Sequence, residues 1–411
     1  GCTPVWRTDD REDFSSRQDE NFKSLAKSIN HIRRPAIGAD GTIYAPSGKT
    51  LLAINPAGRI LWRFVAAATV SRPVIGGDGV IYFGTSGGRG KNRQYKVYAV
   101  NQDGKKKWEL GLKDSVPRVA SINKNEVIFF KGMENLYAVD KEGKILWYYR
   151  LKKRSPYTAY HDEDNTVYIT DGDYLYSLNQ DGSLKWRLKG GFRDNPVIGR
   201  AGIIYVGSND KHFYAIDRDG RVVWKYKTDN RVGAFPKLSA DGTVYFVNHS
   251  KRLYALNVES EGMVDSAWPT FQGDNQNSGR FYVRAQDEAI PDPVVITPPD
   301  PGTPGNKKWF FAGCEDNNFM VHPALDSEGT LYFACNQPTS KFFAVNPDRT
   351  EKWSHEYKDK GLVPHISAPA ITPDNSIIYA VGGTCKGSGN SFINCNKGLL
   401  VKTSANGTVD W

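Results

Sequence analysis

The stretch that decides the fold is Ala53-Ile-Asn-Pro-Ala-Gly58-Arg-Ile-Leu-Trp62. It recurs along the chain, with glycine five and tryptophan nine residues after its first position. Close copies are Ala99 to Trp108, Ala138 to Trp147, Ser177 to Trp186 and Ala215 to Trp224; looser copies are Ala344 to Trp353, with Arg349 for the glycine, and Lys402 to Trp411, with Gly407. The first five tryptophans lie 46, 39, 39 and 38 residues apart. A period of about 40 residues is typical of β-propellers and of some helical arrays.

The residues upstream of each copy indicate strands. A run with an aromatic residue, such as Ile43-Tyr44 or Val167-Tyr168, precedes the motif, and none of these runs keeps a 3.6-residue period. Asp-Gly pairs such as Asp40-Gly41 separate the first two runs and predict two-residue hairpins with positive φ at both central residues. A proline marks the start of each repeat: Pro35, Pro73, Pro117, Pro156, Pro196, Pro236, Pro323 and Pro369.

Eight repeats of four short strands predict an all-β fold, an eight-bladed β-propeller of four-stranded antiparallel blades. A sheet of this size buries its faces only by stacking against its neighbours. We therefore expect the recurrent tryptophan to lie across the adjacent blade, with its indole N–H on a backbone acceptor, and to serve packing and not ligand binding. The predicted blade-docking tryptophans are Trp62, Trp108, Trp147, Trp186, Trp224, Trp353 and Trp411.

Two stretches do not fit the repeat. Residues 1–31 are polar and predict a tether, with a short helix at Phe22 to Ile32, whereas residues 32–411 predict a single propeller. A proline-rich excursion at about 258–308 interrupts the sixth and seventh repeats, and the competing interpretation is a domain boundary. Other fourth strands continue beyond their tryptophan, so we expect either a longer natural chain after Trp411 or completion of that edge by the N-terminal segment.

Composition and charge exclude several classes of function. The chain carries 54 Lys and Arg against 45 Asp and Glu, a net charge of +9, but the basic residues are scattered. Local clusters such as Lys105–Lys107 and Lys152–Arg154 predict a solvated face and not a nucleic-acid site. No apolar run is long enough to span a membrane as a helix.

The pairing of the cysteines indicates the cellular compartment of the protein. The chain has five: Cys2, Cys314, Cys335, Cys385 and Cys395. If Tyr379 pairs with Val401, the same register places Cys385 opposite Cys395, within disulfide reach. Cys314 with Cys335 follows by elimination, although four cysteines allow three connectivities and four free buried thiols remain the alternative. Disulfides predict an oxidising compartment.

The start of the chain resembles the end of a bacterial lipoprotein signal, because the small residue Gly1 precedes Cys2. The resemblance implies lipidation of Cys2. We therefore expect an exported protein of the bacterial periplasm, the outer membrane or the cell surface. Its contact with the membrane would be through this anchor alone.

The repeated motif looks like the tryptophan-docking motif of the quinoprotein (PQQ-type) eight-bladed propellers. The segment Trp268-Pro-Thr-Phe-Gln-Gly-Asp-Asn-Gln-Asn-Ser-Gly279-Arg280 resembles an element that often opens a propeller in non-enzymatic members. These resemblances imply a non-catalytic scaffold for an envelope or surface protein or peptide, similar to the scaffold lipoprotein of the outer-membrane β-barrel assembly machinery. We expect a monomer that does not bind nucleic acid, and the candidate contact regions are Gly87–Lys96, the Trp268–Arg280 element with its proline-rich linker, and Gly383–Lys397.

Two other functions stay open. A PQQ- and Ca²⁺-dependent dehydrogenase of alcohols or sugars would carry an adjacent Cys-Cys disulfide and a set of metal ligands, but the sequence has no Cys-Cys pair. A surface carbohydrate-binding module would use the abundant aromatic residues, most of which the repeat assigns to packing. We therefore expect no catalytic residues, no metal ligands and no cofactor.

Overall fold

The computed structural model describes most of the chain from Arg34 onwards. Within that part every regular element is a β-strand. The predicted tether and its short helix lie outside it. The described residues are 34–87, 94–112, 119–155, 157–192, 195–200, 202–233, 236–250, 252–258, 262–263, 269–270, 273–274, 276–281, 307–311, 319–320, 323–336, 340–357, 365–382 and 399–410.

The strands form eight sheets in the described residues, numbered here as blades 1 to 8 in chain order. Blade 1 contains β1 (Ala36–Ile37), β2 (Ile43–Ser47), β3 (Thr50–Ile54) and β4 (Ile60–Val65). Blade 2 contains β5 (Thr69–Val70), β6 (Val74–Ile75), β7 (Ile81–Gly87), β8 (Gln94–Val100) and β9 (Lys106–Gly111). Blade 3 contains β10 (Val119–Ile122), β11 (Ile128–Lys131), β12 (Asn135–Val139) and β13 (Ile145–Arg150). Blade 4 contains β14 (Tyr160–His161), β15 (Val167–Thr170), β16 (Tyr174–Leu178) and β17 (Leu184–Lys189).

The second half of the ring repeats this arrangement. Blade 5 contains β18 (Val197–Ile198), β19 (Ile204–Gly207), β20 (His212–Ile216) and β21 (Val222–Lys227). Blade 6 contains β22 (Lys237–Leu238), β23 (Thr243–Val247), β24 (Leu253–Asn257) and β25 (Lys307–Phe311). Blade 7 contains β26 (Phe319–Met320), β27 (Ala324–Leu325), β28 (Leu331–Asn336), β29 (Ser340–Val345) and β30 (Glu351–Tyr357). Blade 8 contains β31 (His365–Ile366), β32 (Ala370–Ile371), β33 (Ile377–Gly382) and β34 (Leu399–Thr403).

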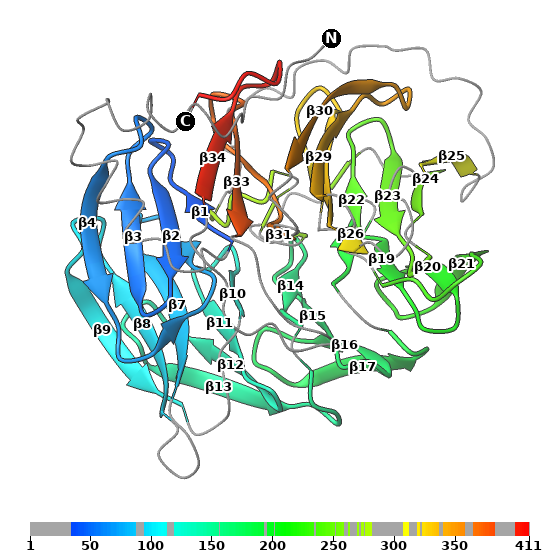
Figure 1. Ribbon diagram of the computed structural model, residues 1–411. Helices are drawn as coiled ribbons and strands as arrows, with labels where there is room; N and C mark the ends of the chain where they lie inside the picture. The colour runs from blue at the N-terminus through cyan, green and yellow to red at the C-terminus, as the bar shows by residue number, and fades with distance from the viewer. Residues whose placement is uncertain are drawn as a thin grey trace, which may run out of the picture.

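Neighbouring strands within each blade are antiparallel, and the blades follow one another around a ring (Figure 1). The fold is therefore the predicted eight-bladed propeller of four-stranded blades. In blade 8 the fourth strand is represented by a bridge between Thr403 and Val409.

The innermost strand is split in blades 2, 7 and 8, where a proline interrupts it, and blades 2 and 8 are alike in the residue that precedes this proline by two positions. Proline has no N–H to donate, so the ladder to the second strand breaks there. In blades 2 and 8 a serine two residues earlier repairs the gap: the Ser71 hydroxyl accepts the Gly84 N–H at 2.9 Å, and the Ser367 hydroxyl accepts the Ala380 N–H at 2.9 Å. Both halves of each split strand consequently stay on the same second strand.

The Asp-Gly turns differ from the predicted two-residue hairpins. Gly41 has a φ of 78°, but Asp40 is not among the residues with positive φ. The Gly38 N–H bonds the Thr42 carbonyl at 2.8 Å and the Asp40 carboxylate accepts the Thr42 N–H at 3.0 Å, so the loop runs from Gly38 to Thr42. The prediction was wrong because aspartate caps the turn with its side chain, which leaves only the glycine left-handed.

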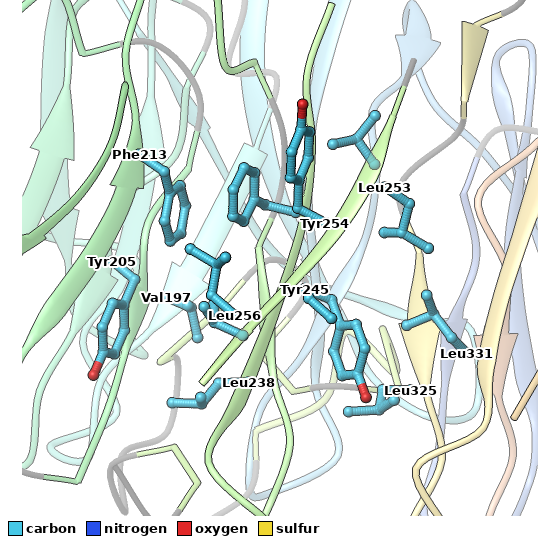
Figure 2. Packing of buried hydrophobic residues seen from close by; sticks show 14 of the residues in the cluster. Val197, Tyr205, Phe213, Leu238, Tyr245, Leu253, Tyr254, Leu256, Leu325 and Leu331 are labelled. Atoms are coloured by element: carbon cyan, nitrogen blue, oxygen red, sulfur yellow. The ribbon is translucent and has the colours of Figure 1, made fainter. Parts of the chain in front are cut away.

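The core lies between the blades. Figure 2 shows how blades 5 and 6 interlock: Tyr205 and Phe213 of blade 5 face Leu238, Tyr254 and Leu256 of blade 6 within one cluster. The rings of Phe213 and Phe246 stack with centroids 4.0 Å apart. Each sheet thus buries both faces against its neighbours, which a four-stranded sheet alone cannot do.

The excursion lies inside blade 6, between its third strand β24 and its fourth strand β25. Because β25 begins at Lys307, the last two residues of the predicted excursion belong to a strand. Trp309 pairs with Ala255, and a bulge follows between Ala255 and Leu256. The same pattern joins Trp62 to Ala53 in blade 1, so Trp309 holds the register position of a docking tryptophan.

Candidate functional site

Five of the seven predicted docking tryptophans lie at the seams between blades. The Trp62 Nε1 donates to the Gln102 carbonyl of blade 2 at 2.6 Å, and an ideal Cβ on Gly104 would lie 2.8 Å from the Trp62 ring. Trp108, Trp147, Trp186 and Trp353 donate in the same way to Lys141, Gln180, Arg218 and Ala405, at 2.8, 2.8, 2.7 and 2.9 Å. A side chain at the motif glycine would collide with the tryptophan of the preceding blade, which explains why the motif has glycine there.

Three of the tryptophans differ from this pattern. Trp224 contacts Tyr205 and Phe213 of its own blade, and no acceptor for its indole N–H lies within the described residues. Trp411 lies outside the described residues. Trp309 was missed in the sequence because the excursion splits its motif, although Gly305 stands four residues before it, as Gly58 stands before Trp62.

Two of the three predicted contact regions lie partly or wholly outside the described residues, whereas the third lies against the blades. The Gly87–Lys96 region is the tip of the extended β7–β8 hairpin, and residues 88–93 lie outside the described part. The Gly383–Lys397 region lies outside it altogether. The Trp268–Arg280 element instead turns into the ring. We call its described residues, with Phe281, the channel clasp: 269–270, 273–274 and 276–281.

The channel clasp bonds to the innermost strands by its backbone. The N–H groups of Ile37 in β1 and Ile75 in β6 donate to the carbonyls of Ser278 and Gly279 at 2.7 and 2.9 Å. The N–H groups of Ile371 in blade 8 and Ile198 in blade 5 donate to the carbonyls of Gln276 and Pro269 at 2.8 and 3.0 Å. Since these strands line the centre of the propeller, the clasp lies in the central channel.

Side chains extend the same attachment to blades 6, 7 and 8. The Lys237 Nζ of β22 donates to the Asp274 carbonyl and to the Asn277 Oδ1, both at 2.7 Å. The Asn277 Nδ2 donates to the carbonyls of Pro323 and Pro369, both at 3.0 Å. Six of the eight blades are therefore tied to one segment, and Trp268–Arg280 is not the free contact loop that we expected.

Burial perturbs the ionisable groups of this network. Burial lowers the pKa of the fully buried Lys237 to about 7, although the nearby Asp274 carboxylate opposes that shift. Burial also raises the pKa of Asp274, against hydrogen bonds from the Ser278 hydroxyl and N–H. The network is thus a structural one, in which buried polar groups are satisfied by one another.

Two arginines also reach the interior of the ring. Arg34 precedes β1 and Arg72 precedes β6, at equivalent places before a proline. Burial lowers the pKa of Arg34 well below its usual range, and the neighbouring Arg72 lowers it further, while Tyr160 of blade 4 opposes this.

One buried pair has the residue types of a nucleophile and a base. The Ser121 Oγ lies 3.1 Å from the His161 Nε2, and both side chains are fully buried. The His161 ring packs on Phe129 with centroids 4.4 Å apart, and burial lowers its pKa to about 3. This pair is part of the seam between blades 3 and 4, where no substrate reaches it.

A cavity of about 270 Å³ lies where blade 8 meets blade 1. Asp40 and Pro56 line it from blade 1, and Asp374 and Lys402 from blade 8. The Lys402 Nζ is 3.4 Å from an oxygen of Asp374 and 3.9 Å from one of Asp410, so its charge is compensated. Across the described residues, no three His, Cys, Asp or Glu side chains gather as metal ligands would.

The cysteines are described only in part. Cys335 is buried in β28 and is disulfide-bonded. Cys2, Cys314, Cys385 and Cys395 lie outside the described residues, so the pairing stays a prediction. The register behind it is confirmed, because Tyr379 pairs with Val401 and Val381 with Leu399.

No helix among the described residues is long and apolar enough to cross a membrane.

Comparison with known proteins agrees with this architecture. The solved structure of BamB from Moraxella catarrhalis superimposes with a TM-score of 0.57 at 14% identity, covering 91% of this chain and 94% of that chain. The C-terminal WD40 domain of Sif2 superimposes with a TM-score of 0.58 at 10% identity, covering 86% and 96%. At these identities the likeness shows the fold alone, and no curated protein sequence matches.

A protein-family model also matches the chain. It is described as outer membrane protein assembly factor BamB, and it matches residues 3–162 and 132–266. The two matches together span more than half of the chain. The chain belongs to the family of the outer membrane protein assembly factor BamB.

Proposed function

We propose that this chain is a non-catalytic, exported propeller that serves as a scaffold for protein partners in the cell envelope. Membership of a family named for an outer-membrane assembly factor supports this role. The observation that carries it is the channel clasp. Because the chain fills the centre of its own ring, the surfaces left for partners are the rim and the loops.

The residues of the channel do not fit PQQ bound over a Ca²⁺ ion. A planar quinone needs an open channel and Ca²⁺ needs several oxygen ligands, carboxylates above all. Here the clasp occupies the channel. The Lys237 amine donates hydrogen bonds to the Asp274 carbonyl and to the Asn277 amide oxygen. The Asp274 carboxylate accepts two hydrogen bonds from Ser278. These contacts favour the scaffold over the dehydrogenase.

We further infer that the chain is exported and anchored through a lipid on Cys2, with residues 1–31 as the tether. The disulfide at Cys335 supports an oxidising compartment such as the periplasm. The experiment is metabolic labelling with a fatty acid in the producing bacterium, with a Cys2→Ser variant as the control. Loss of the label and of membrane association in the variant is expected; equal labelling of both proteins would contradict the anchor.

Site-specific photo-cross-linking in intact envelopes tests the scaffold role. A photoreactive residue at Tyr148, which is 66% exposed on the rim, should give discrete cross-linked proteins, and one at the fully buried Tyr176 should give none. In parallel, purified protein with PQQ and Ca²⁺ should show neither saturable binding nor dye-linked oxidation of alcohols or sugars. Turnover there, with no cross-link on the rim, would overturn the proposal.

A further inference from the structure

The outermost strands of blades 4 and 5 are unusual in charge. β17 reads Leu-Lys-Trp-Arg-Leu-Lys and β21 reads Val-Val-Trp-Lys-Tyr-Lys, so these twelve residues include five cations and no acid. The five cations are exposed, and we call them the basic rim: Lys185, Arg187, Lys189, Lys225 and Lys227. Figure 1 shows both strands at the outside of the ring.

The charges of the basic rim are not compensated within the part of the chain that the structure describes. None of the five makes an ion pair there. Two other outer strands carry acids of their own: Glu109 of β9 pairs with Lys96 and Lys106 at 2.7 and 3.0 Å, and β30 contains two glutamates beside Lys352. β4 and β13 carry one arginine each and β25 carries two lysines, without an acid. β17 and β21 together therefore hold more positive charge than any other two neighbouring outer strands that the structure describes.

A second feature concentrates this charge. The ring of Tyr174 is flanked by two cations, with the Lys152 Nζ 5.3 Å and the Arg187 guanidinium 5.7 Å from its centroid. The aromatic face attracts each cation, so two positive charges are held beside β17.

The backbone of β17 offers the complementary feature. In the described sheet β17 pairs only with β16, so its outer edge still has N–H and C=O groups to share. Lys185, Arg187 and Lys189 are alternate residues and lie on one face, about 6.6 Å apart. An extended polypeptide beside them would present its own alternate side chains at the same spacing.

We propose that the basic rim binds an acidic polypeptide in extended conformation, which adds to the outer edge of β17 with its carboxylates against the lysines and the arginine. A partner strand uses both the edge and the charges, whereas a lipid surface or a nucleic acid uses only the charges. A second copy of this chain would bring cation against cation, since lysines on an edge strand oppose self-pairing. The inference rests on the proposed scaffold function and names the chemistry of its partner.

Binding of a labelled peptide that alternates glutamate with threonine tests the proposal by fluorescence anisotropy. The Lys185→Glu, Arg187→Glu, Lys189→Glu triple variant should weaken binding about tenfold or more, because each reversed pair turns attraction into repulsion. The matched control is Lys105→Glu, Lys106→Glu, Lys107→Glu, which makes the same change in charge on blade 2 and should leave binding nearly unchanged. Circular dichroism verifies that both variants fold.

Two further arms separate the outcomes. Hydrogen exchange should show new protection at the amides of β17 on binding, and a glutamine-for-glutamate peptide should not bind. Equal weakening by both triple variants, or binding only to anionic vesicles or single-stranded nucleic acid, would overturn the proposal. If peptide binding fails while Tyr148 still cross-links to envelope proteins, this inference falls and the scaffold function stands.

Discussion

The Nζ of Lys237 lies 2.7 Å from the Oδ1 of Asn277, although forty residues separate the two in the chain. Lys237 belongs to the innermost strand of blade 6 and Asn277 to the channel clasp. The amide of Asn277 then reaches blades 7 and 8 through the carbonyls of Pro323 and Pro369. This pair therefore connects the segment that fills the channel to the blades around it.

Replacing Lys237 by methionine should destabilise the protein. Methionine fills a similar volume but leaves the Asn277 Oδ1 and the Asp274 carbonyl without their donor. A buried acceptor left unsatisfied costs about 1–3 kcal/mol. Urea unfolding should show a lower midpoint at an unchanged m-value, and the exposed Lys225→Met should shift it by no more than about 0.5 kcal/mol. Equal midpoints for the two variants would show that the network contributes nothing.

Lys237 also predicts a dependence of stability on pH. Its pKa falls from 10.5 to about 7 on folding, so between these values the unfolded chain binds more protons. Stability from this group therefore rises with pH through that window, by at most about 1.4 kcal/mol per pH unit. Lys237→Met should lack this rise. Asp274 remains in both proteins, so parallel stability curves for the two across the window would contradict the prediction.

Tryptophan docking at the seams between blades predicts that an alanine substitution destabilises the protein more at Gly182 than at Gly172. Gly182 and Gly172 both have positive φ, 82° and 96°, but a Cβ on Gly182 would lie 2.6 Å from the Trp147 ring, whereas one on Gly172 would meet nothing within 4 Å. Gly172→Ala should cost about 1–2 kcal/mol from backbone strain alone. Gly182→Ala should cost about 1–3 kcal/mol more, because the ring must move. Equal losses on chemical denaturation would argue against tryptophan docking.

Trp309 should stabilise the ring as the other docking tryptophans do. It holds the register position opposite Ala255 that Trp186 holds opposite Ser177. We expect Trp309→Ala to cost about 3–5 kcal/mol, similar to Trp186→Ala. Trp6→Ala, in the predicted tether, is the control and should change the unfolding free energy little. A Trp309→Ala variant as stable as that control would show that Trp309 is not a docking tryptophan.

The sequence predicts the ring well because its determinants are local and periodic. Glycine and tryptophan recur at fixed spacing, and one hairpin register, such as Tyr379 with Val401, follows from alignment of the repeats. The clasp is not predictable in this way. Ile37 and Ser278 are far apart in sequence, and nothing periodic marks a segment that bonds to six different blades. Trp309 escaped detection for a related reason, since an insertion separates the two halves of its motif.

The resemblance of Trp268–Arg280 to a known element did not reveal its place either. A loop that departs from the repeat is often a binding loop, which is why we expected an exposed contact region. Its residues Asn277 and Ser278 are instead buried, at 0% and 3% exposure. The small and polar residues that look like a flexible loop in the sequence are those that fit among backbone groups in a narrow channel.

Hydrogen exchange at the amides of Ile75, Ile198 and Ile371 tests the central claim most directly. Each donates to a carbonyl of the channel clasp, and together they span three blades. If the clasp closes the channel, these amides exchange only when the whole protein unfolds, as slowly as the amides of the central strands. Exchange through a local opening of much lower free energy would mean that the clasp leaves the channel, and the account of a ring filled by its own chain would be wrong.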